Sequence, residues 1–232
     1  MSPSPTTRNI KAIVFDAYGT LFDVTAVKER CDHYFSGQGA AISDIWRLKQ
    51  LQYTWLGSLM ARYRNFWDIT KASLRYACKS LGLTLTDEIE TDLMEHYYNL
   101  DCYPEAPGAL KQLAQKFPLA ILSNGTSDMI QAAARHNKLD GYLSQIFSVE
   151  DLGIYKPSPQ VYRMAVDELN LTAKEIGFVS SNSWDAVGAK AFGLHVFWIN
   201  RFNQAEEELG FSPDHTIQTL DDLVALLPGA GT

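Results

Sequence analysis

The chain has 232 residues, of which 46% are hydrophobic and 20% charged, and a formal net charge of −7 at pH 7. These values are typical of one globular domain that carries a smaller insertion, with enough apolar material for a buried core. The acidic balance argues against nucleic acid or an anionic membrane as the main partner, so an anionic ligand has to be bound by a few local cations.

The first predicted element is a strand from Ile10 to Phe15 that ends at Asp16 and a glycine-containing turn. Because nearly all of its residues are apolar, the pattern predicts a strand buried on both faces of a parallel sheet. Ligands bind at the carboxyl edge of such sheets. Asp16 is therefore a candidate carboxylate nucleophile that forms a covalent intermediate. The residue two positions later is Tyr18 and not a second acid.

The next segment, residues 24–100, has no convincing strand and shows helical spacing of its apolar residues. This spacing predicts about four helices inserted after the first strand. An insertion at that place lies over the carboxyl edge of the sheet as a cap. Trp55, Leu56 and Leu59 fall on one of the predicted cap helices. The simpler interpretation is that they pack the core of the cap, and the alternative is an apolar stripe between the caps of a dimer.

From about residue 106 the chain alternates between helices and strands. Further strands are predicted at 119–122, 176–179 and 195–199, with a short fifth strand near 216–217. Helices are predicted at 107–117, at 127–139, from 159 onward, at 185–193 and at 220–227. This alternation predicts an α/β fold with a doubly wound parallel sheet.

Polar residues follow three of the predicted strands, at the points where those strands end. They are Asp16 and Thr20, Ser123 and Asn124, and Ser180, Asn182 and Asp185. Lys156 lies on a loop that leads to the same edge of the sheet. Each serine or asparagine alone is more typical of a turn or a helix cap. The ordered set of four segments instead favours a catalytic site at the carboxyl edge.

Over nearly its whole length, from Ile10 to about Leu227, the chain resembles the haloacid dehalogenase (HAD) superfamily. The motifs are the 15–21 turn, the segment 122–125, the segment 155–157 and the loop 180–185. Most members are Mg²⁺-dependent phosphatases. Here Tyr18 and Ser181 stand where those phosphatases place acids, and the loss of two carboxylates weakens an all-oxygen Mg²⁺ site.

These departures, together with the segment 46–55 of the predicted cap, are similar to the L-2-haloacid dehalogenases. The resemblance implies a Rossmann-like core over residues 8–23 and 101–232 and a helical cap over residues 24–100. It also implies hydrolysis of (S)-2-haloalkanoic acids to (R)-2-hydroxy acids through an Asp16 ester, with inversion at C2. No cofactor and no metal are implied. The alternatives are a Mg²⁺-dependent phosphatase acting on a small phosphorylated metabolite and a catalytically silent binding module.

The same resemblance assigns roles to the site residues. Arg47, Asn124 and Trp184 are implied to bind the leaving halide, and Ser123 and Lys156 the substrate carboxylate. Asp185 is expected to activate or orient the water, with Lys156 of depressed pKa as the alternative base. The other implied site residues are Thr20, Ser180 and Asn182, which orient the charges, and Tyr18, Leu51, Phe66 and Tyr162, which contribute to substrate binding. From helical spacing alone, Arg47 is a solvent-facing residue.

Three widely spaced cysteines without a CxxC pair predict reduced thiols. The polar residues 1–8 contain no apolar signal segment, and no apolar run is long enough to span a membrane. These features predict a cytoplasmic protein without nucleic-acid or membrane partners. The five histidines form no zinc-ligand spacing. The expected partners are the 2-haloacid and halide, and the resemblance implies a homodimer.

Overall fold

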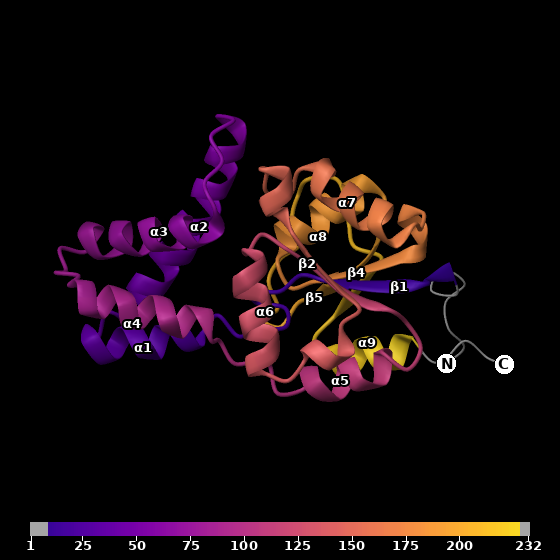
Figure 1. Ribbon diagram of the computed structural model, residues 1–232, viewed down its shortest axis with the longest axis horizontal. Coiled ribbons are helices and arrows are strands. Elements are labelled where there is room, and N and C mark those ends of the chain that lie inside the picture. The colour runs from indigo at the N-terminus through magenta and orange to yellow at the C-terminus, as the bar shows by residue number, and fades with distance from the viewer. Residues whose placement is uncertain (1–8, 228–232) are drawn as a thin grey trace.

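The computed structural model describes residues 9–227 and consists of a core built on a parallel sheet and a group of helices beside it (Figure 1). The sheet has six strands in the order β3-β2-β1-β4-β5-β6, and all neighbours are parallel. The strands are β1 (Ala12–Phe15), β2 (Leu119–Ser123), β3 (Gln145–Ser148), β4 (Ile176–Ser180), β5 (His195–Ile199) and β6 (His215–Ile217). Strand order reverses at β1, so the carboxyl ends of β1, β2 and β4 are adjacent. This is the place where doubly wound sheets bind ligands.

Strand β1 forms the centre of the core. All four of its residues are buried, and its Val14 pairs in register with Ala120 of β2 and Phe178 of β4. In Figure 1, α5 (Ala106–Leu113) and α9 (Leu220–Leu226) lie on one side of the sheet, and α7 (Pro159–Leu169) and α8 (Ser183–Phe192) on the other. Helix α6 (Ser127–His136) connects β2 to β3. Coverage on both faces explains why the strands are apolar throughout.

The inserted cap consists of α1 (Ala26–Tyr34), α2 (Gly39–Leu59), α3 (Phe66–Ser80) and α4 (Asp87–Tyr98). Figure 1 shows these helices beside the core, with the last turns of α2 projecting away from the other three. The chain leaves and re-enters the core through two segments that lie together. Phe22 and Cys102 form an antiparallel bridge, and the Asp23 amide donates to the Asp101 carbonyl over 2.8 Å.

The structure confirms the doubly wound parallel sheet and the inserted helices. One strand was missed: β3 was not predicted, because it is a short edge strand in which only Ile146 and Phe147 are apolar and two residues are partly exposed. Three short 3₁₀ segments were also not predicted: Asp140–Tyr142, Val149–Leu152 and Ala173–Glu175. The expected polar segment 1–8 lies outside the described residues.

The surface of α2 corrects a second expectation. Leu56 and Leu59 do not pack the core of the cap, since they are 43% and 84% exposed, and Leu48 and Met60 are exposed beside them. Trp55 instead lies edge-on against Trp184 of the core, with 5.6 Å between ring centroids. An apolar stripe is therefore left uncovered along α2.

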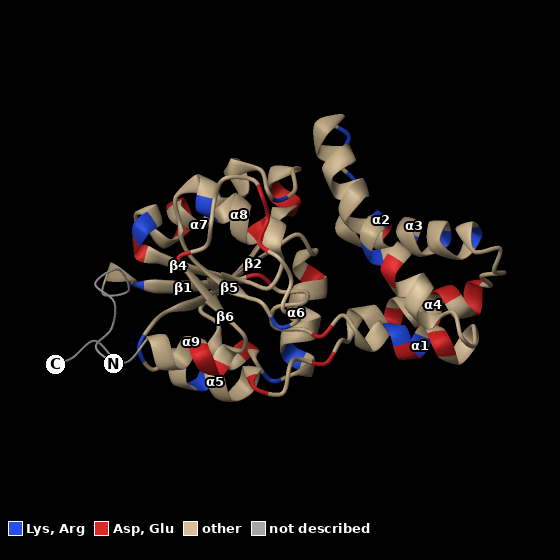
Figure 2. Cartoon of the chain, turned by 180° about the vertical axis from the view of Figure 1, so that it is seen from behind, with Lys and Arg blue, Asp and Glu red and all other residues tan. Residues whose placement is uncertain are grey.

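Charge and cysteine patterns agree with the composition. Figure 2 shows acidic and basic positions along the chain in both the cap and the core, with neither kind confined to one part. Cys31, Cys78 and Cys102 are all unpaired. Among residues 9–227, no helix has both the length and the hydropathy needed to cross a bilayer.

Candidate active site

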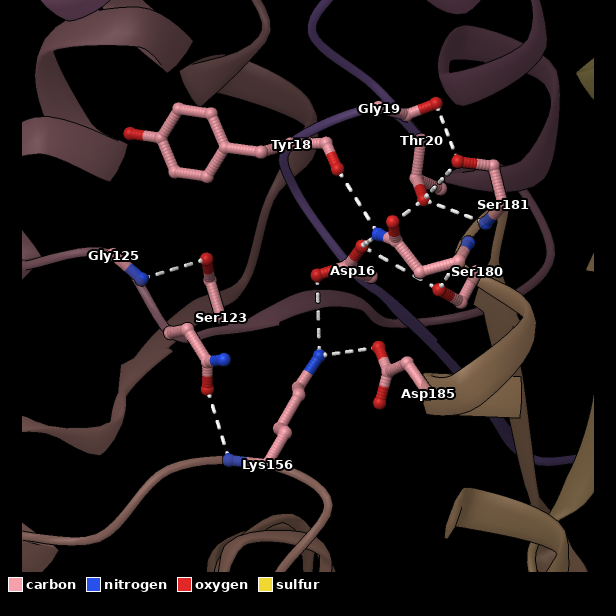
Figure 3. Close-up of polar contacts among 12 residues, drawn as sticks. Asp16, Tyr18, Gly19, Thr20, Ser123, Gly125, Lys156, Ser180, Ser181 and Asp185 are labelled. Carbon is pink, nitrogen blue, oxygen red and sulfur yellow. Dashed lines mark hydrogen bonds and ion pairs between the residues drawn. The ribbon is translucent and has the colours of Figure 1, made fainter. Parts of the chain in front are cut away.

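Asp16 lies directly after β1, at the carboxyl edge of the sheet, and its carboxylate is nearly enclosed. Its amide donates to the Val179 carbonyl of β4 over 2.9 Å, which continues the strand pairing up to the acid. Its two oxygens have different surroundings (Figure 3). Oδ2 accepts hydrogen bonds from Asn182 Nδ2 (2.7 Å), Thr20 Oγ1 (3.2 Å) and Ser180 Oγ (3.4 Å). Oδ1 accepts from Lys156 Nζ at 3.2 Å.

Lys156 lies between two carboxylates and is fully buried. Its Nζ is 3.2 Å from Asp16 Oδ1 and 2.8 Å from Asp185 Oδ2. Burial alone would lower the pKa of Lys156, but the negative charges of the two acids outweigh burial and raise the pKa. The ammonium form is therefore favoured. The alternative role of Lys156 as the base requires a depressed pKa, and the direction here is the opposite, which disfavours that role.

Asp185 lies in the first turn of α8 and is also fully buried. Tyr162 donates its hydroxyl proton to Asp185 Oδ1 over 2.7 Å, so both oxygens of this acid are engaged. Burial raises the pKa of Asp185 to about 6, against the opposing effect of Lys156, and the nearby Asp16 adds to the rise. Asp185 is therefore an anion at neutral pH that accepts a proton under mildly acidic conditions.

The turn that follows Asp16 is joined to the loop after β4 by a short network. The Ser181 amide donates to Thr20 Oγ1 over 2.8 Å, and Ser181 Oγ donates to the Gly19 carbonyl over 2.5 Å. Gly19 has a φ of +86°, and a Cβ added there would lie 3.2 Å from Ser181 Oγ. The left-handed conformation favours glycine here, and a Cβ would in addition press on the Ser181 hydroxyl.

The segment after β2 supplies Ser123 and Asn124. Ser123 is fully buried, and its Oγ accepts a hydrogen bond from the Gly125 amide over 3.1 Å. Asn124 Oδ1 accepts from the Lys156 amide over 3.0 Å, which holds the loop carrying the buried lysine against the end of β2. These residues therefore lie at the same edge as Asp16, as the sequence predicted.

Tyr18 stands where the phosphatases of the superfamily have a second acid, and its ring belongs to a cluster of aromatic side chains. Its side chain points away from the Asp16 carboxylate in Figure 3 and stacks between Phe66 at 5.9 Å and Tyr97 at 5.6 Å. Its buried hydroxyl has no hydrogen-bond partner among the described residues. The pKa of Tyr18 is raised well above its ordinary value, mainly because the hydroxyl is buried and also because two tyrosines and Asp16 lie nearby. Because the ring is packed against aromatic side chains and points away from Asp16, Tyr18 does not take the place of the acid that a phosphatase requires.

The cap brings Arg47 to the site from α2. Arg47 Nη2 donates to Asn182 Oδ1 over 2.5 Å, while the same amide group donates from Nδ2 to Asp16 and to the Tyr18 carbonyl (3.1 Å). Arg47 also lines a cavity of about 520 Å³ between cap and core, together with Leu51, Asn182 and Trp184. Asn182 thus links the cation of the cap to the carboxylate of the core.

Most predicted site residues converge around Asp16, but two placements differ from the expectation. Phe66 does not line the cavity and instead packs on Tyr18 and Tyr155. Tyr162 reaches the site through Asp185 and its Oη is turned to that acid. Within residues 9–227, no group of three or more His, Cys, Asp or Glu side chains is arranged to hold a metal ion.

One contact of the site was missed altogether. Arg201 donates from Nη2 to the Thr20 carbonyl over 3.1 Å and lines the same cavity. A usable signal was present, because Arg201 follows the predicted strand 195–199 by two positions and so falls at the carboxyl edge.

Comparison with known proteins agrees with this geometry. A family model described as haloacid dehalogenase-like hydrolase matches residues 10–193. The chain is 45% identical over 222 residues to the (S)-2-haloacid dehalogenase of Pseudomonas sp. (strain YL), covering 95% of this chain and 96% of that protein. It is 43% identical to the (S)-2-haloacid dehalogenase of Pseudomonas putida, covering 93% and 96%.

A solved structure adds a covalent complex to the comparison. The L-2-haloacid dehalogenase from Xanthobacter autotrophicus with chloropropionic acid covalently bound is similar with a TM-score of 0.90 and 36% identity, covering 96% of this chain and 100% of that chain.

Proposed function

We propose that this chain, which belongs to the haloacid dehalogenase-like hydrolases, hydrolyses (S)-2-haloalkanoic acids to (R)-2-hydroxy acids and halide. The observation that carries the proposal is the asymmetry of the Asp16 carboxylate. Three donors hold Oδ2, and Oδ1 contacts the Lys156 ammonium. An anionic oxygen held in this way is suited to in-line attack on a carbon. Support also comes from the relatives named above, which carry this activity.

In the first step, Asp16 Oδ1 attacks C2 of the substrate, the carbon–halogen bond breaks, and an ester forms with inversion at C2. The halide leaves with the bonding electron pair on the side of the cap. Arg47 receives it, with Asn124 and the edge of Trp184. Ser123 and Lys156 hold the substrate carboxylate, and Leu51 and Trp184, which line the cavity between cap and core, form the apolar surroundings of C2. Exclusion of water strengthens the electrostatic interactions there.

In the second step, water attacks the carbonyl carbon of the Asp16 ester and not C2. The ester carbonyl oxygen is the former Oδ2, which already faces three hydrogen-bond donors. Thr20, Ser180 and Asn182 therefore stabilise the negative charge that develops on this oxygen, as an oxyanion hole does. Asp185, oriented by Tyr162, takes a proton from the water. Collapse of the tetrahedral intermediate breaks the bond between Asp16 Cγ and the former Oδ1, and Asp185 returns the proton to this leaving oxygen. The hydroxy acid is released, and Asp16 loses the remaining proton of the water to solvent.

The alternative, a Mg²⁺-dependent phosphatase, is disfavoured by three groups. Tyr18 points away from Asp16 and so does not take the place of the acid for a leaving alcohol, and Ser181 uses its hydroxyl to bond the Gly19 carbonyl. The Lys156 ammonium occupies the space between Asp16 and Asp185. Hard divalent cations prefer carboxylate oxygens that are free to coordinate.

The test is halide release from (S)- and (R)-2-chloropropionate in EDTA, beside a Mg²⁺ assay on a generic phosphate ester. Halide from the (S) acid alone, with (R)-lactate as product, supports the proposal. Phosphate release that depends on Mg²⁺, without halide from either acid, would replace it with the alternative. Silence in both assays would favour a binding module, and Asp16→Asn would then leave partner binding intact.

Domain boundaries and assembly belong to the same proposal. The core comprises residues 8–23 and 101–232 and the cap residues 24–100, which is supported by the bridge between Phe22 and Cys102 at the crossing; residues 8 and 228–232 lie outside the described part. The three unpaired thiols support a cytoplasmic location.

The exposed stripe of α2, formed by Leu48, Leu56, Leu59 and Met60, supports a homodimer in which two caps pack together. Replacing Leu59 by Glu is expected to convert a dimer to a monomer with activity per subunit changed less than about twofold, measured by light scattering and halide release. Gln112→Glu, at an exposed position of α5 in the core, adds the same charge away from the stripe and is the matched control.

A further inference from the structure

Arg201 is a buried cation that the proposed reaction does not use directly. Its side chain is 9% exposed, and its guanidinium makes three contacts with different groups. Nη1 pairs with Glu105 Oε1 at 2.5 Å, Nη2 donates to the Thr20 carbonyl over 3.1 Å, and the guanidinium carbon lies 3.7 Å from the centre of the Tyr103 ring. The contacts hold the planar group in one orientation.

The first partner, Thr20, belongs to the turn that carries the nucleophile. Thr20 Oγ1 donates to Asp16 Oδ2 over 3.2 Å and accepts from the Ser181 amide over 2.8 Å. No backbone amide of residues 9–227 donates to the Thr20 carbonyl, and its donor is Arg201 Nη2; the Leu21 amide of the same peptide group donates to the Ala17 carbonyl within the turn. Arg201 therefore adds a hydrogen bond from outside the turn to the residue whose hydroxyl contacts Asp16.

The other partners belong to the segment through which the chain returns from the cap. The Tyr103 amide donates to the Leu21 carbonyl over 2.9 Å, and Glu105 immediately precedes α5. Arg201 itself follows β5, which pairs with β4 on the side away from β1. It therefore joins three segments that are distant in the sequence at the base of the crossing between core and cap.

We propose that Arg201 is a positioning residue, which acts through Thr20 to keep the Asp16 carboxylate aimed at C2; the inference rests on the proposed dehalogenation. Glu105 and Tyr103 hold the guanidinium in place for this role. A displacement of the reacting atoms by about 1 Å can cost roughly 100-fold in rate. Because Arg201 acts on the nucleophile and not on the substrate, its loss lowers kcat and leaves KM nearly unchanged.

The experiment compares Arg201→Met, Arg201→Lys and Arg135→Met. Methionine keeps an apolar stem over Tyr103 but removes the donors, and lysine restores a cation that cannot reach Glu105 and Thr20 with the same planar fork. Arg135 is an exposed arginine of α6 that bonds Gln131, and it serves as the matched control. Ester formation is followed in single turnovers by intact mass, with steady-state kcat and KM for (S)-2-chloropropionate.

We expect Arg201→Met to slow ester formation about 10- to 100-fold, with KM within about twofold of the wild type. Arg201→Lys should recover part of the rate, and Arg135→Met should match the wild type. Hydrogen exchange of the amides of residues 17–22 should rise in Arg201→Met, while exchange of strands β2 and β5 stays unchanged.

Wild-type rates and exchange in Arg201→Met would overturn the inference. So would a rate loss accompanied by faster exchange throughout the core, since that pattern describes general destabilisation. If the wild type releases no halide from any 2-haloacid, the proposed function fails. The exchange of residues 17–22 then still decides whether Arg201 holds the turn.

Discussion

The core and the cap contribute to the site in different ways. In the core, four donors from three separate segments converge on the two oxygens of Asp16, and the acid is 7% exposed. From the cap, Arg47 reaches this network through one hydrogen bond, to Asn182. The group that attacks carbon is thus held rigidly in advance, whereas the group that receives the halide lies on the inserted helices. Changes in the core should abolish the chemistry, and changes in the cap should tune it.

The largest effect is expected for Asp16→Asn. An amide oxygen is a much poorer nucleophile than a carboxylate, and turnover should fall by about 10⁴-fold or more. Halide release measures the loss, and intact mass should show no ester after incubation with substrate. A variant that kept more than a tenth of the wild-type rate would mean that Asp16 is not the nucleophile.

Lys156→Met should come next. Removing the cation leaves Asp16 and Asp185 buried and facing each other, which destabilises the fold by about 3–5 kcal/mol. The substrate carboxylate also loses its charged partner. Chemical denaturation and halide release test both parts, with Lys174→Met, at an exposed lysine of the core, as the control. Unchanged stability would show that the two acids are not held together by this ammonium.

Arg47→Lys tests the cap side of the comparison. Lysine keeps the charge but not the planar fork, so kcat should fall about 10- to 100-fold without loss of stability. The loss should be greater for 2-chloropropionate than for 2-iodopropionate, since chloride is the poorer leaving group and depends more on the cation. Lys49→Met, on the same helix with its ammonium over Tyr76, should behave as the wild type. An equal loss for both halides would argue that Arg47 binds the carboxylate.

The smallest effect is a pH dependence. Burial raises the pKa of Asp185 to about 6, and the acid must be ionised to accept a proton from water. Asp16 is uncharged in the ester, which removes one of the causes that raise this pKa. The rate of ester hydrolysis should therefore be constant near pH 8 and begin to fall only below about pH 6, by up to about tenfold per unit. Single-turnover decay of the ester between pH 4 and 8 measures it. A flat profile would remove Asp185 as the base.

The difference between the core and the cap also explains which parts of the site could be predicted from the sequence. The core part of the site follows strand ends, and a buried apolar strand that delivers Asp16 predicts both the sheet and its functional edge. Residues such as Lys156 and Asp185 fall on neighbouring loops, so topology brings them together. Strand β3 was missed because its short, mixed sequence resembles a loop until it pairs with β2.

The cap could be recognised as helical, but helical spacing gives no reason to place Arg47 in the site. Its position depends on how α2 packs against the core, and only family resemblance indicated it. Whether the pKa of Lys156 is raised or lowered likewise depends on the distances from its Nζ to two carboxylates, and no sequence pattern gives these distances. Arg201 was overlooked because its partners, Thr20 and Glu105, are about 181 and 96 positions away.

The most direct test of the covalent mechanism is a single turnover in ¹⁸O-labelled water, with enzyme in excess over (S)-2-chloropropionate. The ester mechanism predicts lactate that contains the unlabelled oxygen of Asp16, and ¹⁸O in the proteolytic peptide that carries this residue. Labelled lactate from the first turnover, with an unlabelled peptide, would show that water attacks C2 directly and would contradict the ester intermediate.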